Sequence, residues 1–289
     1  MSLWKVIQDG SPIHAMTCDV EDYFQVSAFN DHVSRSDWEN FDCRIPQNTD
    51  LILERFAAND VKATFFTLGW VAKRHPGVVR KIAAAGHEIA SHGMQHTRVW
   101  QQSAAEFKQD VQDSRRLLED TAGVPVVGYR AASWSIDERT PWAHDVLSNA
   151  GYKYSSSIYP IKHDHFGMPD APTEPHIAGG GGILEIPASV ASILGRNVPA
   201  AGGGYFRLYP LQFSLWLIRK FESPAGYPLV FYFHPWEMDP DQPRVSSASF
   251  KARFRHYLNL RKFEPRLQVL LEQFKWGRLD EIFLGKDLS

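Results

Sequence analysis

Two histidines in the stretch SHGMQH are candidate metal ligands. His92 and His96 lie four residues apart, so their imidazoles can face one point from a helical turn or a tight loop. Neutral imidazole is a common ligand for divalent metals such as zinc. The chain holds 12 histidines, so a chance pair of polar loop residues is the alternative interpretation.

A cluster of carboxylates follows the first apolar segment of the chain. Asp19, Glu21 and Asp22 stand close together there. Crowded carboxylates raise one another's pKa unless a cation holds them. The cluster therefore either binds a metal or forms a solvated acidic turn. Combined with the histidine pair, it predicts a site of two histidines and one carboxylate with open positions, which is suited to activating water.

Two more polar residues end apolar segments. His234 follows the run LVFYF, and a protonated histidine there can donate a proton to a leaving amine. A core histidine bonded to the backbone is the alternative. Arg130, in GYRAASWS, can orient a carboxylate through two hydrogen bonds or can form a structural salt bridge.

The elements that must position these residues alternate between two patterns. Runs of apolar, β-branched and aromatic residues predict strands at 13–19, 61–68, 87–91, 124–129, 183–186 and 229–233. Apolar residues at helical spacing predict helices at 49–58, 76–85, 103–121, 141–149, 210–221 and 250–274. Asn48 is the expected N-cap of the first helix, and Ser103 with Glu106 predicts a capping box on the third.

Repeated strand–helix units predict an α/β fold with a parallel sheet and helices outside it. Asp19, His92, Arg130 and His234 come just after strands, and the carboxyl ends of parallel strands form the functional face of such folds. A barrel or near-barrel is therefore expected. Two glycine runs, at 179–182 and 202–204, are either mobile loops near the site or structural turns.

Composition excludes several classes of protein. The 289 residues carry a net charge of -2, so nucleic acid is not an expected partner. No stretch approaches the length of apolar chain that crosses a bilayer, and the first residues lack the pattern of a secretory signal. Only two cysteines occur, which favours a reducing compartment, so we expect a cytoplasmic protein. We expect one domain, 1–289, with a helical C-terminal extension from about 245. Nothing indicates the oligomeric state.

In order along the chain, these motifs resemble the polysaccharide deacetylase family, also called the NodB homology domain or carbohydrate esterase family 4. The matching stretches are TCDVEDYFQVSAF, ATFFTLGWVA, GHEIASHGMQH, GYRAASWSI, GGGYFRLYP and FYFHPWEMDPDQPR. They look most like the branch from exopolysaccharide loci of the exosortase, PEP-CTERM type. The resemblance implies a distorted (β/α)7 barrel that hydrolyses N-acetyl groups of an amino-sugar glycan with a divalent metal, most often Zn²⁺.

The resemblance also assigns roles to residues. Asp19 matches the catalytic base, Arg130 the residue that steadies the base, and His234 the general acid. His92 and His96 match the metal ligands. Trp134 and Trp236 are candidates for stacking on a sugar ring, although aromatic residues more often belong to a core.

Three positions depart from the family pattern. Val20 stands where the metal carboxylate often follows the base, so Glu21 is the expected ligand and Asp22 the alternative. The arginine motif has Ala131-Ala132 where a proline is usual, and Ser155 stands where close relatives carry aspartate. Two other functions therefore stay open: an amidohydrolase acting on a non-sugar amide, and a carbohydrate-binding pseudoenzyme.

Overall fold

The computed structural model describes residues 12–164, 166–222 and 226–285. The first eleven residues, part of the stretch in which we expected no secretory signal, lie outside this range. Among the described residues, no helix is long and apolar enough to span a membrane.

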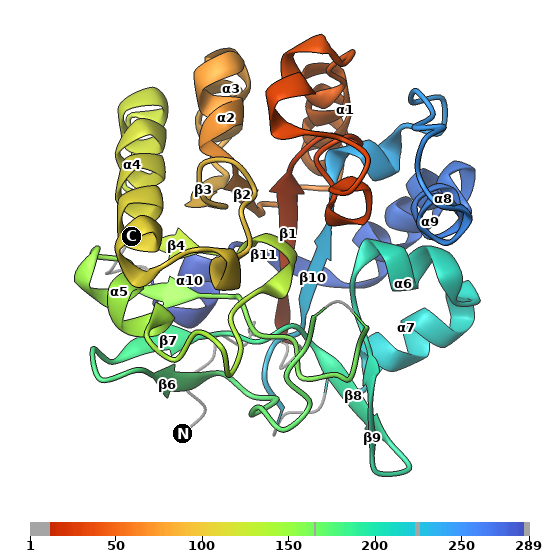
Figure 1. The fold of residues 1–289 in the computed structure, drawn as a ribbon. Coiled ribbons are helices and arrows are strands. Elements are labelled where there is room, and N and C mark those ends of the chain that lie inside the picture. Colours follow the sequence, from red (N-terminus) through yellow and green to blue (C-terminus); the bar gives the residue numbers. More distant parts are fainter. Residues whose placement is uncertain (1–11, 165, 223–225, 286–289) are drawn as a thin grey trace.

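One curled sheet organises the chain (Figure 1). Its seven parallel neighbours are, in order, β10 (Val230–Phe233), β1 (Ile13–Val20), β2 (Thr64–Thr67), β3 (Glu88–Ser91), β4 (Gly128–Tyr129), β5 (Tyr154–Ser155) and β7 (Ile183–Glu185). Antiparallel β6 (His176–Ala178) extends the β7 edge, and β11 (Lys275–Gly277) pairs with β1. This half-barrel confirms the expected distorted barrel.

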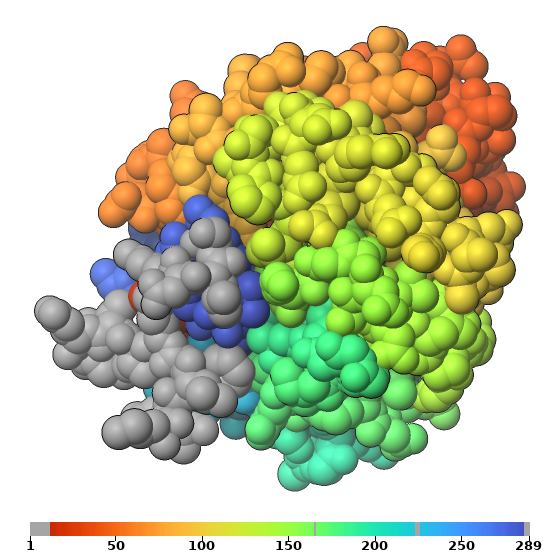
Figure 2. All heavy atoms as spheres, turned by 90° about the vertical axis from the view of Figure 1, so that its left-hand side faces the viewer, coloured from red at the N-terminus to blue at the C-terminus, as the bar shows by residue number. Residues whose placement is uncertain are grey.

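Most of the helices cover the outside of the sheet, and the last one packs on its inner side. They are α1 (Ile45–Ala58), α2 (Gly69–Arg74), α3 (Pro76–Ala84), α4 (Ala104–Ala122), α5 (Ala143–Asn149), α6 (Gly203–Leu208), α7 (Leu211–Arg219), α8 (Phe250–Tyr257), α9 (Leu260–Gln273) and α10 (Leu279–Phe283). Figure 2 shows α3, α4 and α5 forming one continuous outer surface, in orange, yellow and green.

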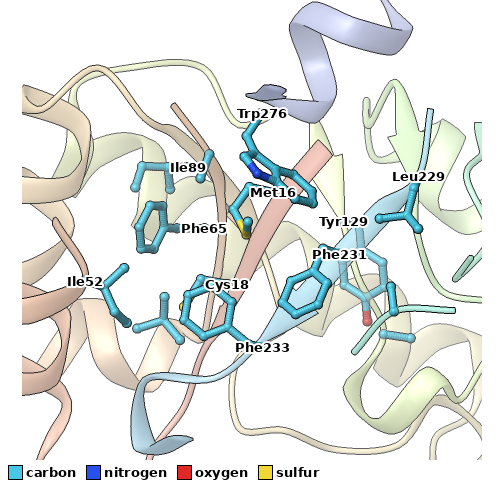
Figure 3. Packing of buried hydrophobic residues seen from close by; sticks show 14 of the residues in the cluster. Met16, Cys18, Ile52, Phe65, Ile89, Tyr129, Leu229, Phe231, Phe233 and Trp276 are labelled. Atoms are coloured by element: carbon cyan, nitrogen blue, oxygen red, sulfur yellow. The ribbon is translucent and has the colours of Figure 1, made fainter. Parts of the chain in front are cut away.

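Alternation along β1 divides its side chains between two cores. Met16 and Cys18 face the outer helices, where they pack near Phe65 of β2 and Phe233 of β10 (Figure 3). Ala15 lies in the inner core, which the apolar residues of α10 help to fill. Because side chains on a strand alternate between faces, Thr17 and Asp19 share the inner face with Ala15. Asp19 therefore points inward near the carboxyl end of β1.

Of the two predicted helix caps, one is confirmed and the other is wrong. Ser103 and Glu106 form the expected capping box of α4. Helix α1 begins at Ile45, so Asn48 is a buried residue within the helix and not its N-cap. The carboxylate of Asp22 instead accepts hydrogen bonds from the backbone N–H groups of Arg44 (2.6 Å) and Ile45 (3.2 Å). A cap supplied from a distant segment leaves no local sequence signal.

Other elements were not predicted. They include α2, α6, β5 and the hairpin of β8 (Val190–Ile193) and β9 (Arg196–Pro199). The expected strand 124–129 is reduced to β4. The helix expected over 250–274 is divided into α8 and α9, because Asn259 adopts a left-handed conformation with φ of 52°. Instead of only a helical extension, the C-terminal segment adds β11 to the sheet and α10 to the inner core.

Candidate active site

A cleft of about 540 Å³ lies against the expected site residues. It is lined by most of them, namely Asp19, Glu21, His92, His96, Trp134, His234 and Trp236. Arg130 reaches the cleft through Asp19, whereas Asp22 does not line it. The parallel sheet thus brings together residues that are up to 217 positions apart.

Glu21, His92 and His96 form the densest group of potential metal ligands. One ligand atom from each lies within 4.8 Å of the others, and all three side chains are buried. Glu21 Oε2 lies 2.8 Å from His96 Nε2 but makes no hydrogen bond. Burial raises the pKa of the Glu21 carboxyl, but His96 and His234 more than offset this effect and lower it to about 2. Glu21 is therefore a carboxylate at neutral pH.

The two histidines are held so that their rings point into the cleft. His92 Nδ1 donates to the Arg130 carbonyl oxygen at 2.8 Å, which leaves Nε2 as the free ligand atom. Burial lowers the pKa of His92 to about 4, so the ring is neutral, as a metal ligand must be. His96 has a left-handed backbone with φ of 53°, and Arg35 donates to its carbonyl oxygen at 3.1 Å.

Asp22, the alternative metal ligand, points elsewhere. Its two carboxylate oxygens accept from backbone N–H groups of Tyr23, Arg44 and Ile45. Burial raises the pKa of the Asp22 carboxyl to about 6, despite these hydrogen bonds. Asp22 therefore anchors the start of α1 to the loop after β1.

Asp19 and Arg130 form a buried ion pair beside the metal-ligand group. Arg130 Nη1 donates to Asp19 Oδ1 at 2.7 Å and to Thr17 Oγ1 at 2.8 Å. The guanidinium also bonds to Ser156 and lies over the ring of Phe66, at 4.0 Å from the ring centroid. These contacts fix the Asp19 carboxylate at the wall of the cleft.

His234, at the end of β10, lies on the cleft wall and begins a row of charged groups that continues through Glu237 to Arg207. Its Nε2 lies 3.4 Å from Glu21 Oε1, and its Nδ1 lies 3.2 Å from Glu237 Oε2. Arg207 donates from Nε to Glu237 Oε1 at 2.8 Å, and both side chains are buried. Burial opposes charge on His234, but Glu21 and Glu237 more than compensate and raise its pKa to about 9.

Gly203 allows helix α6, which carries Arg207, to approach Glu237 closely. A Cβ atom at Gly203 would lie 1.9 Å from Glu237 Oε2. A glycine is therefore required where α6 approaches the carboxylate. The run 202–204 thus lies beside the site, whereas the run 179–182 packs near Asp145 and Ser148 of α5 as a turn between β6 and β7.

Both candidate tryptophans line the cleft, but each is only 5% exposed. The ring of Trp236 stacks on His234 and on His256. The guanidinium carbon of Arg130 lies 4.7 Å from the centroid of the Trp134 ring. Trp134 and the preceding Ser133 both have a left-handed backbone conformation. Their rings are therefore largely occupied by packing against His234 and Arg130.

The two other departures from the family pattern have local structural reasons. The Ala131 N–H donates to Ser157 Oγ at 2.9 Å, a bond that proline cannot make. Ser155 pairs across the sheet with Glu185, a fully buried carboxylate that also bonds to His144. An aspartate at position 155 would place a second negative charge beside Glu185, so serine is the compatible residue here.

Glu237 and Arg207 are functional residues that the sequence did not predict. Both occur in quoted motifs, HPWE and GGGYFRLYP, but lie 30 residues apart. Of the two, only Glu237 could have been singled out in the sequence, because it follows His234 by three residues. Only the packing of α6 against the end of β10 shows that the arginine completes it.

Two family models match successive parts of the chain. Residues 33–155 match the model of the polysaccharide deacetylase family. This part of the chain belongs to the polysaccharide deacetylase family. Residues 156–284 match a domain of unknown function, DUF3473. This second match covers β7, α6, β10 and most of the C-terminal elements, including the segment that carries His234 and Glu237.

Curated relatives match part of the chain. A chitooligosaccharide deacetylase of Rhizobium leguminosarum bv. trifolii is 32% identical over 111 residues, which are 37% of this chain and 49% of that protein. A peptidoglycan-N-acetylglucosamine deacetylase of Bacillus cereus is 33% identical over 75 residues, or 26% of this chain and 27% of that protein. The chain thus spans half or less of the length of these relatives.

Solved structures share the fold over nearly the whole chain. A Mycobacterium smegmatis crystal structure assigned to the polysaccharide deacetylases has a TM-score of 0.58 and 20% identity, covering 95% of this chain and 90% of that chain. A mutant of a carbohydrate esterase family 4 pseudoenzyme with restored enzymatic activity has a TM-score of 0.50 and 16% identity, covering 94% and 67%. These matches concern the fold alone.

Proposed function

We propose that this polysaccharide deacetylase family member is a metal-dependent hydrolase that removes N-acetyl groups from an amino-sugar glycan. The observation that carries the proposal is one cleft with three kinds of group on its wall. A metal-ligand group, a carboxylate held by arginine and a histidine held by a buried carboxylate all face it.

The metal would be held by Glu21, His92 and His96. Their donor set of one carboxylate and two imidazoles suits zinc, and the buried Glu21 Oε2 without a hydrogen bond offers an unused ligand atom. A divalent ion bound there supplies Lewis-acid polarisation of the amide carbonyl and lowers the pKa of water. Asp22 has no part in this set, because its carboxylate caps α1.

Asp19 would act as the general base. Arg130 holds one of its oxygens, Oδ1, and so fixes the orientation of the carboxylate. Asp19 takes a proton from the attacking water as the carbon–oxygen bond forms. The ion pair holds Asp19 in place between turnovers.

His234 would act as the general acid. The amide nitrogen leaves as an amine only after it gains a proton, and the raised pKa keeps His234 protonated at neutral pH. Glu237 accepts from Nδ1, so the proton on Nε2 faces the cleft. Trp236 holds the imidazole ring by stacking on it, which makes Trp236 a positioning residue rather than a sugar platform.

The substrate we propose is an N-acetylated glycan of a bacterial exopolysaccharide or its precursor. The family match, the named activities of the relatives and the motif resemblance support this class. We also propose a reducing compartment, the cytoplasm, since Cys18 and Cys43 are both unpaired and Cys18 is buried. The chain would act as one unit, because β11 and α10 complete the sheet and the inner core.

The test is acetate release from N-acetylglucosamine oligomers by the purified chain. We expect activity that is lost on chelation and restored by zinc. Asp19→Asn and His234→Ala should each retain metal and lose about 10²–10⁴-fold in turnover. Metal binding without acetate release from any N-acetylhexosamine substrate would instead favour a binding protein. Release from a simple non-sugar amide at a higher rate would favour the other amidohydrolase.

A further inference from the structure

Helix α8 and the start of α9 form a basic surface that the proposed chemistry does not use. Residues 242–263 contain no aspartate or glutamate. The same stretch carries six exposed basic side chains: Arg244, Lys251, Arg253, Arg255, Arg261 and Lys262. Asp164 pairs with Lys251 and Arg255, and Asp241 pairs with Arg261, so an excess of positive charge remains.

Two phenylalanine side chains project into solvent from this basic surface. Phe250 is 84% exposed and Phe254 is 53% exposed. They are four residues apart on α8, so they share one face of the helix, and their rings stack at 6.4 Å between centroids. An exposed phenylalanine pair has no polar group with which to bond to water or to sugar hydroxyls. Its natural environment is hydrocarbon.

A different face of α8 contributes to the cleft. Lys251, Ala252 and Arg255 line it, together with Ser249 at the N-cap of the helix. Ala252 also packs against the aromatic cluster that contains Trp236. The orientation of α8 is therefore fixed, with Phe250 and Phe254 outside the cleft lining. Figure 1 shows α8 with α9 at the right-hand edge of the molecule.

We propose that α8 docks this protein on an anionic lipid bilayer, with Phe250 and Phe254 inserted at the headgroup–acyl boundary. A short basic helix with aromatic residues on one face is typical of such interfacial binding. Charge complementarity selects anionic headgroups, and the phenylalanines select a bilayer over a soluble polyanion. Docking of α8 places the cleft entrance next to the membrane. If the proposed deacetylase function holds, the natural substrate is then a glycan attached to or growing at that membrane.

The test is co-sedimentation of the full chain with vesicles, without substrate. Vesicles of phosphatidylglycerol and phosphatidylcholine in equal parts should bind the protein, pure phosphatidylcholine vesicles should not, and high salt should release it. Phe250→Ser/Phe254→Ser should lose most of the binding. Arg253→Gln and Lys262→Gln should each weaken it by about fivefold, the effect of one basic residue near an anionic surface.

Matched controls come from the other side of the molecule. Ile177→Ser removes an apolar residue of β6 that is 66% exposed, and Lys108→Gln removes a charge from α4. Both should bind vesicles as the unchanged protein does. The phenylalanine variant should keep its melting temperature and its acetate release from soluble oligomers, so a failure of docking is separable from a failure of the proposed activity.

Two outcomes would overturn the proposal. In one, the unchanged protein and the phenylalanine variant bind anionic vesicles equally. In the other, neither binds vesicles while the protein binds a soluble acidic oligosaccharide such as oligogalacturonate. The second outcome would assign the basic surface to an anionic glycan.

Discussion

Replacing Glu237 by glutamine removes the buried negative charge between Arg207 and His234. The carboxylate lies 2.8 Å from Arg207 Nε and 3.2 Å from His234 Nδ1, and it has no exposure to solvent. Glutamine has nearly the same shape but only one acceptor oxygen. Its NH₂ group must therefore face an N–H group of either Arg207 or His234.

Two effects of different kinds should follow. Breaking a buried ion pair leaves the Arg207 charge without compensation and should reduce the free energy of unfolding by about 3–5 kcal/mol. The loss of a negative charge beside the imidazole should also lower the pKa of His234, by roughly 1–3 units. The high-pH limb of the pH profile of turnover should move to lower pH by that amount. Turnover at neutral pH should fall by about 10–100-fold.

The sign of the effect on stability can be checked in metal-free protein. Because the folded-state pKa of His234, about 9, lies above its ordinary value of 6.5, the stabilisation is complete below pH 6.5. It is lost as pH rises through about 9. In Glu237→Gln the pKa of His234 should lie closer to 6.5, so less stability should be lost as the pH rises. Chemical denaturation from pH 6 to about pH 10 measures it.

Two controls separate positioning from stability. Glu185→Gln breaks the buried pair of Glu185 and His144, which lie 2.9 Å apart and do not line the cleft. It should cost stability while leaving the pH profile in place. Arg207→Met/Glu237→Leu should recover stability, because both charges are removed, but not turnover. A folded, metal-loaded Glu237→Gln protein with an unchanged profile and turnover would refute the role given to Glu237.

Three further predictions test the other assignments. Asp22→Ala should lower the free energy of unfolding by about 1–2 kcal/mol through loss of the α1 cap and leave metal content unchanged, as measured by denaturation and elemental analysis. In contrast, His92→Ala/His96→Ala should abolish metal binding, so that chelation no longer changes the melting temperature; full metal occupancy would disprove the site. Ser155→Asp should destabilise the protein increasingly as pH rises above about 4, because two carboxylates would ionise beside each other at Glu185, and a stability curve independent of pH would contradict this reasoning.

Strand and helix periodicity predicted most of the elements, together with their order. Runs such as VKATFFTL are buried strands because β-branched and aromatic side chains pack well on a pleated surface. Since strand ends follow directly from such runs, the positions of Asp19, His92, Arg130 and His234 on one face were also predictable. All four lie at or near the carboxyl ends of β1, β3, β4 and β10.

Other features depended on contacts between distant segments. The sequence favoured Glu21 over Asp22 as the partner of the proposed ligands His92 and His96 but left Asp22 open, because both residues follow the same strand. The start of α1 resolves it by taking the Asp22 carboxylate as its cap. A hydrogen bond between positions 22 residues apart carries no local pattern, so the cap could not be predicted and Asp22 stayed open as the alternative ligand.

The environment of the proposed acid was likewise decided by tertiary structure. The histidine and the glutamate of HPWE are neighbours in the sequence, but the state of Glu237 depends on Arg207, which arrives on α6, and on Gly203, which allows α6 to approach. Residue types and spacing determined which groups this chain brings to one face of a parallel sheet. Their charges and orientations were determined only by packing, because burial and distance set the electrostatic energy of each group and neither can be read from local sequence.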